Sequence, residues 1–340
     1  MDSNQRSRDS SRTTALLSRT AGIREFRRYF SLVSRTLTPS PDEEHEDDPL
    51  LDLEVLLRQT WNIFGISALF DFKCDDEVRM KSYGKKLREE VAANLSNEDV
   101  SYEAKISVLE IKRPKETDHP IVQIEVQAKI MTRETQQKTL VYRGFLISWR
   151  TEPTDLLTEN STRLPLLLCR GTVRTMRAVH AILGRMFDCM IVSLPTNAED
   201  LAWLLPIFIS PGGGQDTIKE HHEALLEYSV PGLHKSECLH IRFLIKDLME
   251  LWKSVSDDKD RIDVEEIDEF HKILQQQVME IGGVHLGLCL LHRIHLPSIV
   301  ISESKMKIMN VETMNTILTY LNEKALECLH LNTSQLSTSK

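Results

Sequence analysis

The chain has 340 residues, a hydrophobic fraction of 41% and a formal net charge of −9 at pH 7, so it can bury one large core or two moderate ones. The acidic balance argues against a generic polyanion binder, although a local patch can differ from the overall sum. No apolar run approaches the roughly 20 residues that span a bilayer, and the six cysteines are widely spaced without an N-terminal signal peptide, so we expect a soluble intracellular protein with reduced cysteines and no membrane insertion.

Residues 1–48 contain little that could form a core. Arginines alternate with serine and threonine, and an acidic run follows (Asp42, Glu43, Glu44, Glu46, Asp47 and Asp48). Such a composition predicts a disordered basic and acidic tail. The alternative is a basic arm that contacts DNA, which phosphorylation at the Thr38-Pro39 and Ser40-Pro41 sites would weaken by adding negative charge.

A helix is expected after Pro49 and before Gly65, because apolar residues recur on one side (Leu53, Leu56, Leu57, Trp61 and Phe64). A short strand is expected from Leu69 to Cys74. Asp75 or Asp76 can cap a second helix, whose apolar positions have core spacing (Val78, Tyr83, Leu87, Val91 and Leu95).

Three stretches of alternating apolar and polar residues follow, at 102–111, 122–130 and 139–149. This period is typical of half-buried strands, and the polar connections between the stretches favour an antiparallel meander.

Residues 161–208 have the order strand, helix, strand, helix. The runs 164–168 and 190–194 predict buried strands, and residues 172–187 have helical spacing. Apolar side chains share one half of that helix (Val173, Met176, Val179, Leu183, Met186 and Phe187), and Arg174, Arg177 and Arg185 lie in a narrow arc opposite. The next helix is predicted to begin with a capping box of Thr196 and Glu199 and to end at Pro211.

The remaining chain is also mixed. We expect a short helix ending near Leu226, a half-buried strand around 239–245 and a helix over 247–255. A capping box of Asp263 and Glu266 predicts another helix, whose apolar positions are Ile267, Phe270, Leu274, Val278 and Ile281. Strand-like runs at 284–292, 299–302 and 306–309 precede a closing helix whose apolar positions run from 314 to 329.

These elements predict an α+β fold of mostly antiparallel sheets packed with helices, in two sub-domains. The expected boundaries are a disordered tail at 1–48, an N-terminal half at 49–210, a linker at 211–235, a C-terminal half at 236–331 and a disordered tail at 332–340.

Four blocks of the sequence resemble a known family. The order LPLLL, an amphipathic helix, MFDC and NAEDLAWLL is similar to the centromere protein L family, subunits of the inner kinetochore. Three further blocks resemble the same family in the same order, LLRQTWNIFGISALFDF, LHIRFLIKDLMELWKSV and KIMNVETMNTILTYLNEKAL. The match is carried by order, spacing and apolar pattern.

The resemblance implies a nuclear, non-enzymatic architectural subunit of the constitutive centromere-associated network, at the kinetochore of the centromere, with a role in chromosome segregation. It further implies an obligate heterodimer with centromere protein N, contact with centromere protein C and other inner kinetochore subunits, and a place beside centromeric nucleosomal DNA.

Motifs for catalysis, cofactors or metals do not support another function. The PGGGQDT stretch at 211–217 lacks GxxxxGK, no GxSxG is present, and alternation puts His285 and His292 on opposite faces of the expected strand. We expect no catalytic, cofactor-binding or metal site. A nucleic-acid-binding protein outside the kinetochore remains the first alternative, and an unrecognised enzyme the second.

Two surfaces are candidates for function. Arg174, Arg177 and Arg185 could face DNA, because three guanidinium groups in one arc create a local positive field, and the alternative is an ordinary solvated helix surface. The apolar run near the C-terminus could be an edge strand that pairs with the partner protein, and its residues are Ile299, Val300, Ile301, Met306 and Ile308.

Overall fold

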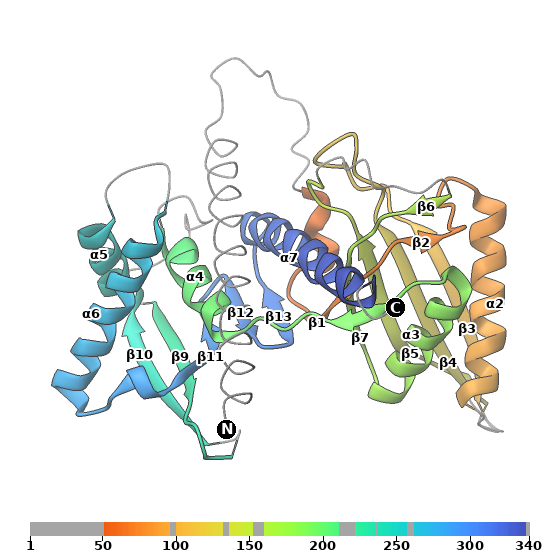
Figure 1. The fold of residues 1–340 in the computed structure, drawn as a ribbon. Coiled ribbons are helices and arrows are strands. Elements are labelled where there is room, and N and C mark those ends of the chain that lie inside the picture. Colours follow the sequence, from red (N-terminus) through yellow and green to blue (C-terminus); the bar gives the residue numbers. More distant parts are fainter. Residues whose placement is uncertain are drawn as a thin grey trace, which may run out of the picture. The chain divides into compact units, whose positions relative to one another are not determined.

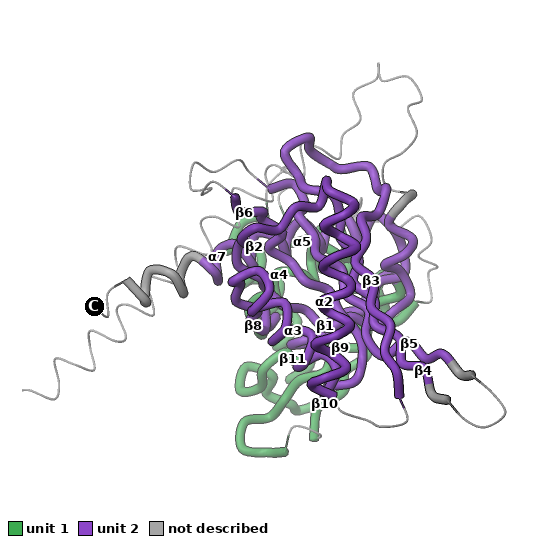
Figure 2. The backbone as a smooth tube through the Cα atoms, turned by 90° about the vertical axis from the view of Figure 1, so that its right-hand side faces the viewer, with its two compact units in different colours: residues 1–47, 197–297 green, residues 48–196, 298–340 purple. Residues whose placement is uncertain are grey.

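The computed structural model describes residues 51–95, 100–131, 136–151, 160–210, 222–234, 237–256 and 262–337. Two compact units are formed, unit 1 within residues 197–297 and unit 2 within residues 48–196 and 298–340 (Figure 2). The predicted tail at 1–48 lies outside the described residues. The units are not divided at the expected linker 211–235, because residues 298–337 return to unit 2, where they pair with its sheet and cover it.

Unit 2 contains most of the predicted N-terminal elements and the closing helix (Figure 1). In chain order they are η1 (Leu51–Leu56), β1 (Thr60–Ile66), β2 (Leu69–Phe70), α2 (Glu77–Leu95), β3 (Val100–Val108), β4 (Val122–Met131), β5 (Gln136–Ile147), β6 (Ser161–Thr162), β7 (Leu166–Gly171), α3 (Val173–Phe187), β8 (Ile191–Ser193), β12 (Ile299–Ser302), β13 (Lys305–Ile308) and α7 (Val311–Ser337).

The main sheet of unit 2 is antiparallel, with the strand order β12-β13-β1-β7-β5-β4-β3, and β8 also pairs with β1. The predicted meander is confirmed as β3-β4-β5. The predicted strand, helix, strand order of the central stretch is confirmed as β7, α3 and β8. Strand β7 lies between β1 and β5, and its residues Leu166–Cys169 are buried.

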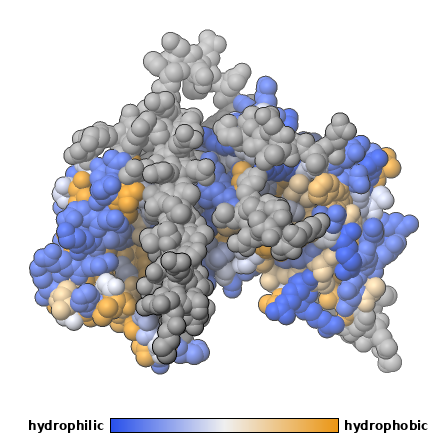
Figure 3. Space-filling model, in the orientation of Figure 1, coloured by the Kyte–Doolittle hydropathy of each residue, from blue (hydrophilic) through white to orange (hydrophobic). Residues whose placement is uncertain are grey.

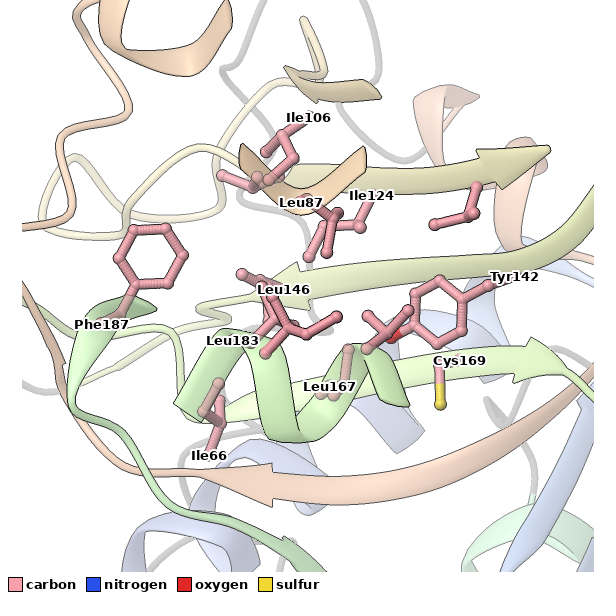
Figure 4. Close-up of a cluster of buried hydrophobic side chains, with 14 of the residues drawn as sticks. Ile66, Leu87, Ile106, Ile124, Tyr142, Leu146, Leu167, Cys169, Leu183 and Phe187 are labelled. Atoms are coloured by element: carbon pink, nitrogen blue, oxygen red, sulfur yellow. The ribbon is translucent and has the colours of Figure 1, made fainter. Parts of the chain in front are cut away.

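Helices cover both faces of this sheet. On one face, α2 and α3 enclose a core that includes Leu87, Ile124, Leu146 and Leu183 (Figure 4). The other face carries the side chains of Trp61 and Ile63, and Gly65 lies on the same face by alternation. A Cβ atom built on Gly65 would lie 3.8 Å from the Cβ of Ala325, so α7 packs on this second face.

The helix predicted through Trp61 and Phe64 is wrong. Only a short 3-10 helix, η1, precedes Leu57, and residues 60–66 form β1. The spacing of Leu57, Trp61 and Phe64 fits a helix, but the run TWNIFGI is rich in aromatic and β-branched residues and also fits the alternating burial of a strand. Pairing with β7 and β13 on its two sides decides between these two fits.

Unit 1 packs three helices on a small antiparallel sheet of order β10-β9-β11. Its elements are α4 (Ala198–Ile209), β9 (Glu223–Ser229), β10 (Cys238–Leu244), α5 (Ile245–Val255), α6 (Val264–Gly282), η2 (Leu286–Leu288) and β11 (Leu290–His295). The outer surface of α5 and α6 is largely hydrophilic (Figure 3), and their inner surfaces meet through Trp252 and Phe270, whose ring centroids are 5.6 Å apart.

Two predictions in unit 1 are wrong. The short helix expected to end near Leu226 is strand β9, in which Ala224, Leu226 and Tyr228 alternate into the core. The strand expected over 284–292 begins only at Leu290, after the 3-10 turn η2. The capping box of Asp263 and Glu266 is confirmed, since the Asp263 N–H donates to the Glu266 carboxylate at 2.8 Å.

The capping box of α4 is displaced by one residue from the prediction. Asn197 Oδ1 accepts from the Asp200 N–H at 2.8 Å, and Asp200 Oδ2 accepts from the Asn197 N–H at 2.7 Å. Thr196 instead donates its N–H to the carbonyl of Glu303. Thr196 with Glu199 and Asn197 with Asp200 both fit the capping-box pattern. The second pair forms the box, because the Thr196 N–H is already bonded to Glu303.

Three apolar side chains expected at core positions are exposed, Val78, Val173 and Ile281, at 78%, 60% and 90%. Each lies in the first or last turn of its helix, where the helix surface extends past the element on which it packs. Helical spacing therefore gives the buried side of a helix but not the length over which that side is covered.

Candidate functional site

Helix α3 carries the predicted arginine surface, and its position is fixed at both ends. Thr172 Oγ1 accepts from the Thr175 N–H at 3.3 Å, which caps the first turn, and Asp188 ends the helix in a left-handed conformation. The helix docks through its apolar half, where Val179, Leu183 and Phe187 are buried. The three arginines are consequently exposed on the opposite side, as the spacing predicts.

Two of these arginines bond to helix α2. Arg185 Nη2 lies 2.7 Å from Glu90 Oε2, and Arg174 Nη2 donates to the carbonyl oxygen of Leu95 at 3.1 Å. The Leu95 carbonyl is at the C-terminal end of α2, where partial negative charge favours a cation. Arg174 and Arg185 therefore join α2 to α3 in addition to facing solvent.

Arg177 differs from the other two. Among the residues that the structure describes, it alone of the three arginines has no hydrogen bond or ion pair. Its charge is available to a ligand, whereas the charge of Arg185 is offset by Glu90. Glu90 and Leu95 could not be predicted as partners from the sequence, because intrahelical spacing carries no information on which helix lies beside α3.

The predicted partner interface forms a β-hairpin in unit 2. In it, β12 pairs with β13 in the register Ile299↔Ile308, Val300↔Lys307 and Ile301↔Met306. Strand β13 also pairs with β1, so Met306 lies opposite Trp61. The hairpin therefore continues the sheet that the meander begins.

Four of the five proposed interface side chains are in the core. Ile299, Ile301, Met306 and Ile308 are at most 1% exposed. Val300 is half-buried, and alternation directs its side chain to the face opposite Ile299 and Ile301. The expected edge strand is wrong, because β12 is an internal strand in the strand order of the sheet. A partner that contacts this hairpin would use the Val300 side chain.

One buried pair has the residue types of a nucleophile and a base. Cys169 Sγ lies 3.6 Å from His180 Nε2, and the His180 ring meets the Phe64 ring edge-on, with the ring centroids 4.7 Å apart. Burial raises the pKa of Cys169 to about 12 and lowers the pKa of His180 to about 4. Both groups are therefore neutral near pH 7, whereas a cysteine nucleophile must be a thiolate. Their contact contributes to core packing.

No helix in the described part of the chain is both long enough and apolar enough to cross a bilayer.

Comparison with known proteins identifies what the chain is similar to. A family model described as centromere protein L matches residues 55–326. Centromere protein L of Homo sapiens is 23% identical over 327 residues, which cover 92% of this chain and 92% of that protein. Centromere protein L of Gallus gallus is 26% identical over 265 residues, covering 75% and 74%. That of Bos taurus is 22% identical over 324 residues, covering 92% and 91%.

Proposed function

Because the chain belongs to the centromere protein L family, whose members are non-enzymatic kinetochore components located at the centromere, we propose that it is an architectural subunit of the constitutive centromere-associated network that pairs with centromere protein N. The observation that carries this proposal is the extent of the match. Residues 55–326 include both compact units, so the whole fold is shared with the family and not one motif.

The proposed contact with centromere protein N uses the β12-β13 hairpin. Its support is that β12 is short and apolar, and that Val300 presents a half-buried apolar side chain on it. A surface of this kind favours packing of an apolar side chain of the partner, because this contact would cover the remaining apolar area. Contact with centromere protein C and other inner kinetochore subunits belongs to the same proposal and rests on family membership.

A DNA-facing role for α3 is the second part of the proposal. The exposed Arg177 supports it directly, and Arg174 and Arg185 support it to the extent that their bonds to α2 leave charge at the surface. Binding would act through phosphates without sequence preference, since contacts of guanidinium groups to phosphates carry no sequence information.

The test is affinity purification of the tagged full chain from mitotic and interphase nuclei, with partners identified by mass spectrometry. Recovery of centromere protein N in stoichiometric amount with other inner kinetochore subunits is expected. Recovery of nucleic acid and general DNA-binding proteins without centromere protein N would overturn the proposal in favour of a role outside the kinetochore.

A further inference from the structure

A row of charged side chains crosses the face of the unit 2 sheet opposite α2 and α3. Lys105 of β3 lies in register with Glu125 of β4, and Glu125 with Arg143 of β5. Arg143 in turn lies in register with Arg170 of β7. Residues in register share a face, and the neighbouring Ile106 points into the core on the other face. These four side chains, named the charged row below, span three strand separations, or roughly 14 Å.

The carboxylates on this face are already offset by cations. Glu125 Oε1 lies 2.7 Å from Arg143 Nη2. Glu103 pairs with Lys129, and its other carboxylate oxygen lies 3.8 Å from the Lys138 amine. The remaining cations of these strands on this face therefore give it an excess of positive charge.

The two ends of the charged row carry that excess. Lys105 is exposed, and its side chain has no hydrogen bond or ion pair among the described residues. The Arg170 guanidinium lies over the Trp61 ring, 5.6 Å from its centroid, a contact that leaves its charge in place. A hollow of about 360 Å³ lies at the Lys105 end, and its lining includes Glu103, Glu125 and Arg88, which pairs with Glu89 at 3.8 Å. An acidic ligand therefore finds positive charge at both ends of the row.

The described chain begins at the Arg170 end of this row. The Trp61 indole N–H donates to the Leu56 carbonyl at 2.7 Å, so η1 lies beside the ring that carries Arg170. The acidic run at 42–48 ends three residues before η1 begins at Leu51. Three residues extend at most about 10 Å, and the seven residues of the run at most about 25 Å. The run is therefore close enough to reach the charged row and long enough to cross it.

From this arrangement we infer that residues 42–48 of this chain dock on the charged row, with carboxylates beside Arg170 and Lys105, and shield it from other acidic ligands. Single ion pairs at a surface are weak, but a short tether keeps the run at a local concentration in the millimolar range, so several pairs act together. The charged row lies on the face of the sheet opposite α3, so the inference goes beyond the proposed function and does not depend on it.

Zero-length crosslinking of the full chain tests the contact. A carbodiimide joins a carboxylate to an amine where the two groups meet. We expect residues 42–48 to be joined to Lys105 or Lys138 at least fivefold more often than to Lys246 or Lys253, which are exposed lysines of unit 1. The preference should disappear in 1 M salt, because salt screens exposed charges. Equal crosslinking to the two pairs of lysines at low salt would overturn the inference.

Competition with an added peptide tests the shielding. The probe is a fluorescent peptide of six glutamates, titrated into the full chain. Replacing the acidic residues of 42–48 by asparagine and glutamine should strengthen its binding at least fivefold, because the charged row is then uncovered. Adding Lys105→Gln with Lys138→Gln should cancel this gain, whereas Lys246→Gln with Lys253→Gln, an equal charge change, should keep it.

Two results of the competition would overturn the inference. One is equal binding of the peptide by the wild type and the neutralised chain, and the other is loss of the gain with both pairs of lysine replacements, which would indicate an effect of net charge alone. Circular dichroism of all variants should match the wild type, since the replaced lysines are exposed. Neither result bears on recovery of centromere protein N, so the two proposals fail separately.

Discussion

Trp61 is among the largest side chains that the core encloses completely. Its indole N–H donates to the Leu56 carbonyl at 2.7 Å, and its ring meets Phe145 edge-on at 5.3 Å. Trp61→Ala removes this packing and leaves the Leu56 carbonyl without its donor, so the free energy of unfolding should fall by about 3–5 kcal/mol. Urea denaturation of the full chain measures it. A decrease below about 1 kcal/mol would mean that the site collapses or that Trp61 is not enclosed.

His180 should make stability depend on pH. Burial lowers its folded-state pKa to about 4, below the ordinary value of 6.5, so unfolding takes up a proton between these two pH values. Stability therefore falls as pH decreases through this window, by at most about 1.4 kcal/mol per pH unit. His180→Phe should be less sensitive to pH over the same range, and His295→Phe, at an exposed position, serves as the control. Parallel pH curves for wild type and His180→Phe would contradict the assignment.

Single residues were predictable where burial follows from apolar character alone. The burial of Trp61 could be inferred although its secondary structure could not. The exposure of Arg174, Arg177 and Arg185 could be inferred because they lie opposite the apolar half of their helix. The bonds of Arg185 to Glu90 and of Arg174 to Leu95 could not be inferred, because they join residues 95 and 79 positions apart. Such contacts are set by the packing of α2 beside α3.

The start of α4 gives a test at the scale of one element. Asn197 and Asp200 exchange the two cap hydrogen bonds, whereas Thr196 Oγ1 is buried with no partner in the described residues. Asn197→Ala should cost about 1 kcal/mol, and Thr196→Val, which replaces an unsatisfied hydroxyl by a methyl group, should cost nothing or stabilise. Thermal unfolding of both variants distinguishes them. The reverse order of stability would restore the box of Thr196 and Glu199.

Elements with one strong signal were predictable, and ambiguous ones were not. The alternation in β4 extends over 10 residues and gave the meander, and α6 was defined by its cap at Asp263. The segments of β1 and β9 are each 7 residues long and fit both a strand and two turns of helix. Their state is decided by neighbouring strands, since pairing satisfies backbone groups along the whole length.

The hairpin of β12 and β13 carries the prediction for the partner contact. Val300→Glu adds a charge on the half-buried face of β12 while Ile299 and Ile301 stay in the core. We expect copurification with centromere protein N to be abolished and the circular dichroism spectrum to resemble that of the wild type. Val173→Glu, at an exposed position of α3, is the matched control and should copurify normally. Equal recovery with both variants would move the interface elsewhere.

On the scale of the whole molecule, the chain does not follow the expected linear division. Residues 298–340 belong with residues 48–196, so unit 2 is completed only when the C-terminal segment is present. Asn322 Oδ1 accepts from the Trp149 N–H at 3.1 Å, and Asn315 Oδ1 accepts from the Trp149 indole at 3.0 Å, which fixes α7 on the sheet through buried polar bonds. Composition and spacing do not encode this return, because both halves have the same mixed pattern of helices and strands.

The net charge of −9 opposes DNA binding by this chain, so binding would depend on the local positive charge of the α3 arginines. Removing one arginine that binds a phosphate should lower the slope of log affinity against log salt by about 0.9. Arg177 has no protein partner among the described residues and Arg185 is paired with Glu90, so Arg177→Gln should account for most of the change produced by the triple replacement of Arg174, Arg177 and Arg185. The measurement is a salt titration of heterodimers with centromere protein N on unrelated DNA duplexes, with Arg242→Gln on unit 1 as the control of equal charge. Coincident slopes for wild type and Arg177→Gln would show that the arginine surface of α3 is only solvated, and any DNA contact would then belong to the partner.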